Sequence, residues 1–196
     1  MHWTAEHGLD AIVKIIHHYT TDEQSINDCD HAGYSPLHYA ATNNRLSTVE
    51  YLISAGARVN HTCAYGGEMV GPSALHLAAA RGHLEVVQYL VSVGANIDCS
   101  HSDHRTLFGD TPLAWAVVNK HLPVVLCLID AGCDLDKADN DYNTPLHKAG
   151  YLGLLSIVEL LVRRGANVRI NNHRQENVIE ISRRGGSQEV MGYLAG

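Results

Sequence analysis

A sequence unit that recurs along the chain constrains its fold more than any other feature. Four segments can be laid on one another, starting at Gly33, Gly71, Gly109 and Tyr142, and these starts are 38, 38 and 33 residues apart. A fixed period of about 20 to 50 residues is typical of a solenoid, in which each unit buries its apolar face against its neighbours. We therefore expect a stack of similar units rather than one central core.

Each unit carries the signals of two consecutive helices. A Ser or Thr stands where a helix N-cap is needed, and in three units a Pro follows at the first helical position. After a polar break, apolar residues recur at helical spacing until a glycine ends the second helix. The caps are Ser35, Ser73, Thr111 and Thr144, and the closing glycines are Gly56, Gly94, Gly132 and Gly165. The predicted fold class is an all-α repeat solenoid.

Both ends of the chain continue this pattern in a weaker, more polar form. Residues 3–16 match the later part of a unit, and residues 178–194 fall on unit positions near the C-terminus. Degenerate terminal units are typical of solenoids, because they prevent end-to-end stacking. We expect one domain of about six units: a degenerate unit at 1–32, clear units at 33–70, 71–108, 109–141 and 142–174, and a degenerate cap at 175–196.

The repeated motifs are SPLH at Ser35, TPLH at Thr144, the variants SALH and TPLA, and the endings GANID at Gly94 and GANVR at Gly165. These motifs resemble those of ankyrin repeats. The resemblance covers essentially the whole chain. It implies a curved stack of helix pairs with projecting hairpin fingers, which binds partner proteins through the fingers and the concave surface of the inner helices. A protein-interaction scaffold or adaptor is therefore expected, and the resemblance leaves its partner open.

Two adjacent fingers, at 61–70 and 99–108, are each five residues longer than the others. They carry apolar and aromatic residues where a bare loop would be polar. Such anchors in a mixed polar surround are typical of an interface hot spot. We expect these residues to bind the partner, and the alternative is that the two fingers pack on each other. The residues are Tyr65, Met69, Leu107 and Phe108.

The inner-helix surface is the second expected binding region. In similar proteins the positions that face the concave side correspond to Thr42, Asn43, Ala80, Arg81, Val118, Asn119, Tyr151 and Leu152. Val118, Tyr151 and Leu152 would form an exposed apolar patch, and such patches tend to mark contacts. Ordinary packing between units is the alternative, especially for Trp115, which stands at a leucine position.

Most of the 14 histidines are expected to be structural. His38, His76 and His147 belong to the repeated tetrapeptide, and His83 lies in the turn between two helices. One cluster has the ligand types of a tetrahedral zinc site, although its spacing fits no standard zinc signature. It comprises His61, Cys63, Cys99, His101 and His104.

The sequence contains no motif of a catalytic site, so we expect no enzyme and no cofactor. The Ser and Thr at each unit start serve as caps, which leaves no nucleophile and base that are obviously paired. Modification is another alternative to the scaffold role. Asn60 ends a hairpin eight residues after Leu52, and this setting resembles that of hydroxylated asparagines in ankyrin repeats.

Composition restricts the partners and the compartment. The net charge of −7 argues against general nucleic-acid binding, which depends on Lys and Arg. Five cysteines without CxxC spacing favour a reducing, intracellular and cytoplasmic setting, with the nucleus also possible. No apolar run is long enough to span a membrane. The expected protein is a monomer that binds another protein, and its more basic C-terminal end could meet an acidic partner.

Overall fold

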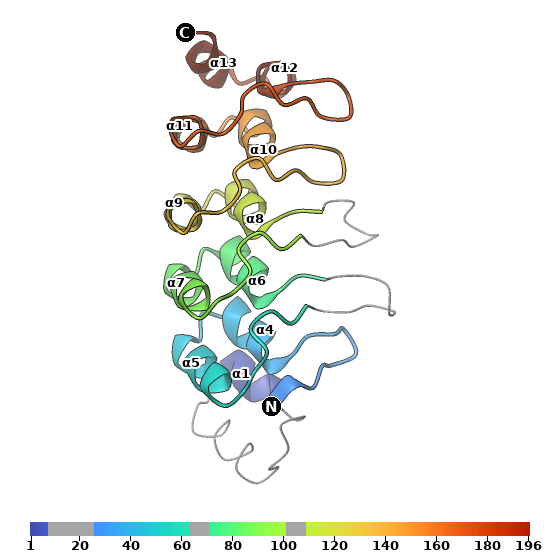
Figure 1. Cartoon of the computed structure of the whole chain (residues 1–196), viewed down its shortest axis with the longest axis vertical. Coiled ribbons are helices and arrows are strands. Elements are labelled where there is room, and N and C mark those ends of the chain that lie inside the picture. The colour runs from blue at the N-terminus through green and yellow to red at the C-terminus, as the bar shows by residue number, and fades with distance from the viewer. Residues whose placement is uncertain (8–25, 63–70, 101–108) are drawn as a thin grey trace.

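A computed structural model describes residues 1–7, 26–62, 71–100 and 109–196, and in these residues the chain forms an elongated stack of helix pairs (Figure 1). The inner row consists of α1 (His2–His7), α4 (Pro36–Thr42), α6 (Ala74–Arg81), α8 (Pro112–Val118), α10 (Pro145–Tyr151) and α12 (Val178–Arg184). The outer row consists of α5 (Leu46–Ser54), α7 (Leu84–Ser92), α9 (Leu122–Asp130), α11 (Leu155–Arg163) and α13 (Gln188–Ala195). Each inner helix contacts the next inner helix. The predicted all-α repeat solenoid is confirmed.

The helices begin and end at the residues that the sequence marks. The Thr111 side chain accepts a hydrogen bond from the Ala114 N–H at 3.2 Å and so caps α8. After α5, Gly56 takes a left-handed φ of 97°, and the next N–H, of Ala57, donates to the Leu52 carbonyl at 2.9 Å. This arrangement satisfies carbonyls at the helix end that would otherwise lack a donor. The caps therefore set where inner helices begin and where outer helices end.

Two columns of leucines form the core of the stack. Each inner helix and each outer helix of the four clear units contributes one leucine that is at most 1% exposed. Small residues beside them let the helices approach closely, and a Cβ added at Gly150 would meet Val178 and Ser182 of the next helix. Full burial of one leucine contributes about 1.5–3 kcal/mol. The columns are Leu37, Leu75, Leu113 and Leu146 in the inner row, and Leu52, Leu90, Leu128 and Leu161 in the outer row.

Histidine rings connect successive units. The Nε2 of His76 donates to the carbonyl of Asp110 at 3.1 Å, and the Nε2 of His147 donates to that of Glu176 at 3.2 Å. In the turns between helices, the Nε2 of His83 donates to the Thr42 carbonyl at 2.9 Å. These histidines are therefore structural, as the sequence predicts.

The Asn or Asp that stands just before each finger makes a second connection. Its side-chain oxygen accepts a hydrogen bond from a backbone N–H of the following unit at 2.7–2.9 Å. Because each bond joins only neighbours, the stack is held together one junction at a time. The acceptors are Asn27, Asn60, Asp98 and Asp136, and the donors are Arg58, Asn96, Asp134 and Asn167.

The shorter fingers are turns closed by one Asp or Asn side chain. Asp139 Oδ1 accepts hydrogen bonds from the N–H groups of Asp141 and Asn143 at 2.9 and 2.8 Å. Asp30 and Asn172 occupy the same place in their fingers. Of the longer fingers, the described part includes one antiparallel bridge, between Thr62 and Ser73. No helix among the described residues is long and apolar enough to cross a membrane.

The backbone at Lys120 is strained, and a glycine at this position should relieve the strain. It lies in the turn between α8 and α9 with a φ of 64°, a conformation that costs an L-residue about 1 kcal/mol. Replacing Lys120 with Gly should therefore raise the free energy of unfolding by about 1 kcal/mol, measured by urea denaturation. Lys120→Ala is the matched control, because it removes the same side chain and keeps the strain. Equal stability of the two variants would contradict the argument.

Stability should fall as the pH drops below neutrality. Burial, followed by the positive charge of His61, lowers the pKa of His38 from 6.5 to about 4. The unfolded chain then takes up this proton first, so the contribution of His38 is complete above about pH 6.5 and is lost as the pH falls toward 4. Between pH 7 and pH 5 the loss is about 2 kcal/mol. His38→Gln should reduce the difference between urea unfolding at pH 7 and at pH 5, and an unchanged difference would refute this.

Candidate functional site

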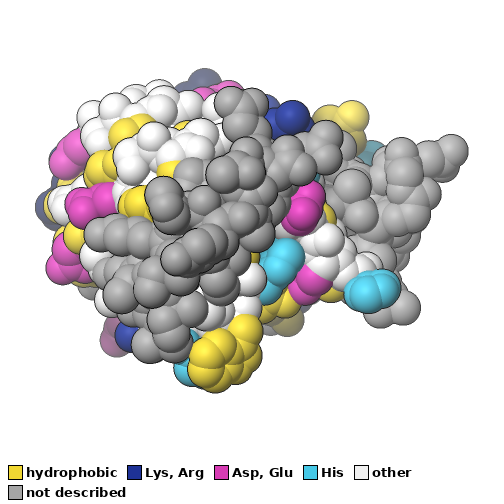
Figure 2. Space-filling view, turned by 90° about the horizontal axis from the view of Figure 1, so that it is seen from below, with side chains coloured by type: hydrophobic (Ala, Val, Ile, Leu, Met, Phe, Trp, Pro, Cys, Tyr) yellow, Lys and Arg dark blue, Asp and Glu magenta, His cyan; other side chains and the backbone are white. Residues whose placement is uncertain are grey.

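Three exposed apolar side chains meet on the inner-helix side of the stack. Val118 at the end of α8 is 42% exposed, and Tyr151 and Leu152 at the end of α10 are 48% and 40% exposed. They line a cleft of about 330 Å³, here called the inner-helix cleft. Trp3, which is 62% exposed, lies instead on α1, at the end of the stack viewed in Figure 2. The other residues that line the cleft are Asp110, Asn143, His147, Lys148, Ile181 and Arg184.

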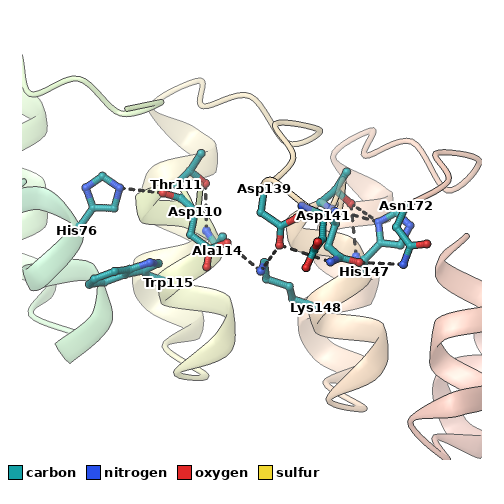
Figure 3. A network of polar contacts seen from close by, with 12 residues as sticks. His76, Asp110, Thr111, Ala114, Trp115, Asp139, Asp141, His147, Lys148 and Asn172 are labelled. Carbon is teal, nitrogen blue, oxygen red and sulfur yellow. Dashed lines mark hydrogen bonds and ion pairs between the residues drawn. The ribbon is translucent and has the colours of Figure 1, made fainter. Parts of the chain in front are cut away.

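A buried group of three charges lies at the cleft: Asp110 and Lys148 line it, and Lys148 also contacts Asp139 (Figure 3). Lys148 Nζ lies 2.8 Å from Asp110 Oδ1 and 2.7 Å from Asp139 Oδ2, and the three side chains are 14%, 9% and 0% exposed. Burial acts to lower the pKa of Lys148, but the carboxylates of Asp110 and Asp139 outweigh it and raise that pKa. Lys148 is therefore a charged ammonium. It joins the unit at 142–174 to both carboxylates of the unit at 109–141.

This ion cluster stands at a junction where the histidine connection is missing. At the position of His76 and His147 the intervening unit has Ala114, which has no ring to donate to the next unit (Figure 3). Lys148 and Asp110 instead join α10 to the residue before the cap of α8. The TPLA variant of the tetrapeptide is the sequence signal of this change. The cleft therefore opens at the one clear unit whose tetrapeptide lacks histidine.

The rim of the cleft carries an arginine that is held in place. Arg184 Nη1 lies 3.2 Å from Glu176 Oε2, and the guanidinium carbon lies 5.5 Å from the centroid of the Tyr151 ring. A guanidinium over an aromatic face is attracted by the ring. The side chain of Arg184 is still 39% exposed. Arg184 therefore presents a positive charge directly beside the apolar wall.

The structure brings together part of the predicted site. Val118, Tyr151 and Leu152 share the cleft. Asn119 is exposed at the end of α8, where its amide donates to the Trp115 carbonyl at 2.8 Å, and Arg81 is exposed on α6 away from the residues that line the cleft. Trp115 is half-buried, with its ring edge-on to His76. The finger residues Tyr65, Met69, Leu107 and Phe108 lie outside the described residues.

Lys148 and Tyr142 were not predicted as part of the site, and Arg184 was included only as one of the bases of the basic C-terminal end. Tyr142 is 56% exposed at the tip of its finger, has a left-handed φ of 61°, and packs edge-on against His173 with ring centroids 4.5 Å apart. The signal for Tyr142 was available, because the other three clear units begin with glycine. A bulky residue in that conformation is unusual. For Lys148 the sequence holds no comparable signal.

The candidate zinc ligands are only partly described. The structure brings the Nε2 of His61 to 3.0 Å from the sulfur of Cys29, a residue that the prediction did not include. The sulfur of Cys99 lies 3.6 Å from Ser73 Oγ. Cys63, His101 and His104 lie outside the described residues. Within the described ranges, no three His, Cys, Asp or Glu side chains are grouped so that they could hold a metal.

Asn60 has the same structural role as its counterparts in other units. Its side-chain oxygen accepts from the Asn96 N–H at 2.7 Å, and its amide donates to the Gly94 carbonyl at 3.2 Å. Asn27 makes the equivalent two bonds one unit earlier. The geometry therefore explains why asparagine stands at this position and adds nothing that favours its hydroxylation.

Comparison with known proteins agrees with this architecture. The family described as ankyrin repeats (3 copies) matches residues 1–101 and 75–172. Among curated proteins, alpha-latrotoxin-Lh1a from Latrodectus hasselti is 38% identical over 66 residues, which are 34% of this chain and 5% of that protein. The chain therefore covers only a small part of the length of this relative.

Removing the buried ammonium should strongly destabilise the stack. Lys148→Met leaves the carboxylates of Asp110 and Asp139 without their cation, and such a loss costs about 3–5 kcal/mol. Arg163→Met is the matched control, because it breaks an exposed ion pair with Glu159 that contributes about 0.5 kcal/mol or less. Urea denaturation at pH 7 measures both. A loss from Lys148→Met no larger than that of the control would show that the cluster is not a structural connection.

Proposed function

This chain belongs to the ankyrin-repeat family, and we propose that it is a non-catalytic scaffold that binds a partner protein at the inner-helix cleft. Ankyrin repeats are in general protein–protein interaction modules, so the family supports the class of function and leaves the surface and the partner open. The proposal adds the surface: the cleft between α8, α10 and α12 and its rim.

One observation carries this proposal. Val118, Tyr151 and Leu152 are among the few large apolar side chains of the described residues that are exposed, and they come from two successive inner helices to line the same cleft. The leucines at the junctions beside them are almost completely buried. Contiguous apolar surface on a protein tends to mark an interaction site. The grouping of these three residues therefore supports a binding role rather than a structural one.

The long fingers are the second part of the proposed binding face. Their composition supports this part: Tyr65, Met69, Leu107 and Phe108 are the residue types that anchor interfaces. Among the shorter fingers, Tyr142 offers a similar exposed aromatic ring next to His173. Asn143, which follows Tyr142, lines the cleft. A partner in the cleft would therefore also lie close to the base of this finger.

Disrupting the cleft should abolish partner binding without unfolding the stack. The test is quantitative affinity capture from cell lysate with the intact chain and with Leu152→Asp, which places a charge in the apolar wall. Leu126→Asp on α9 is the matched control, because Leu126 is 38% exposed, close to the 40% of Leu152, and lies in the outer row. Circular dichroism checks that both variants keep their helix content. We expect a partner that the intact chain and Leu126→Asp retain and that Leu152→Asp loses by at least tenfold.

The other outcomes have clear meanings. Equal capture by all three proteins would remove the cleft from the binding face. In that case, shortening each long finger by five residues tests the second part of the proposal. Partners that survive both changes would contradict the proposed binding face as a whole.

A further inference from the structure

We propose that the partner segment that occupies the inner-helix cleft combines one large apolar side chain with an acidic residue next to it. The inference rests on the proposed function and specifies its chemistry. An apolar subsite of the cleft lies next to the basic side chain of Arg184. The subsite selects the apolar side chain of the partner, and Arg184 selects its acidic residue.

The apolar subsite is defined by its walls and by its volume. Val118, Tyr151, Leu152 and the buried Ile181 form the apolar part of the lining of a cleft of about 330 Å³. This volume is at the lower end of the range of small-molecule pockets, so it suits one large side chain rather than a folded element. Burying such a side chain contributes about 1.5–3 kcal/mol. The cleft therefore offers a partner one apolar anchor point.

The charged side chains at the cleft do not oppose the binding of an apolar side chain. The ammonium of Lys148 is already bridged by the carboxylates of Asp110 and Asp139. A partner's apolar group therefore covers an ion cluster whose charges are compensated, which avoids the cost of burying an unpaired charge. For the same reason Lys148 is a poor attractor of a partner carboxylate, although it also lines the cleft.

The accessible charge at the rim is basic. Of the charged side chains that line the cleft, Arg184 is the most exposed, at 39%, whereas Lys148 and Asp110 are 14% and 9% exposed. A partner therefore meets the guanidinium of Arg184 before it meets the carboxylate of Asp110. Complementarity of charge across an interface favours an acidic residue at this point.

The two subsites are too close to be served by distant parts of a partner. The guanidinium of Arg184 lies over the Tyr151 ring, and the same ring forms a wall of the apolar subsite. A carboxylate that pairs with Arg184 therefore belongs to a residue within a few positions of the apolar anchor. The predicted partner motif is a large apolar residue with Asp or Glu at most about one helical turn away.

Selection from a random peptide library tests this inference. Phage that display random 12-residue peptides are selected on the full chain, and phage that also bind Leu152→Asp are removed. We expect the retained peptides to share a large apolar residue with Asp or Glu within four positions. For a synthetic retained peptide, Arg184→Glu should weaken binding by about fivefold or more. Arg163→Glu, on the exposed side of α11, is the control and should change the affinity less than twofold.

A charge exchange completes the test. Replacing the acidic residue of the peptide with Lys should weaken binding to the intact chain and restore binding to Arg184→Glu. Retained peptides that are basic or uncharged, or acidic peptides whose affinity Arg184→Glu leaves unchanged, would overturn this inference while the cleft remains a binding site. If no selected peptide depends on Leu152, both the inference and the assignment of the cleft fail.

Discussion

The burial of two leucine columns between successive units is the constraint on which the rest of the structure depends. No helix pair of this chain can cover its own apolar face, so each unit is stable only against its neighbours. The capping residues set the helix lengths, and the small residues set the distance at which the columns meet. The histidine rings and the Asn or Asp side chains then fix the register of each junction, because their hydrogen bonds reach one backbone group of the next unit.

The proposed binding surface lies where this regular scheme changes. At the junction between the units around Thr111 and Thr144, Ala114 replaces the histidine, and a buried ion cluster around Lys148 makes the connection instead. The same junction exposes Val118, Tyr151 and Leu152. Residues that do not hold neighbouring units together are available to contact a partner. The candidate site thus lies at a junction that differs from the others, and the regular junctions keep the rest of the stack folded.

The part of the candidate site that the sequence placed depends on register alone, and its binding role stays a prediction. The repeat places Val118, Tyr151 and Leu152 at the ends of inner helices, and at these positions a side chain faces outward whatever its neighbours are. The sequence did not indicate the ion cluster of Lys148 or the place of Arg184 over the Tyr151 ring, because these features depend on residues of other units. Asp110 is 38 residues from Lys148 in sequence, and the Tyr151 ring that Arg184 covers belongs to a different helix. Tyr142 could have been singled out from the sequence, since it stands where the other clear units have glycine.

The sequence by itself determined the all-α solenoid, the helix pair of each of the four clear units and the structural role of the histidines in the repeated motif. These features are local or repeat with a fixed period, so caps, helical spacing and the period are enough to specify them. Only the tertiary structure decided that Lys148 bridges two carboxylates, that His61 lies against Cys29 rather than in a group of three or more described metal-ligand side chains, and that Arg184 borders an apolar cleft. These features depend on distances between side chains of different units. Such distances are set by how closely the helices pack, which a pattern of residues along the chain does not contain.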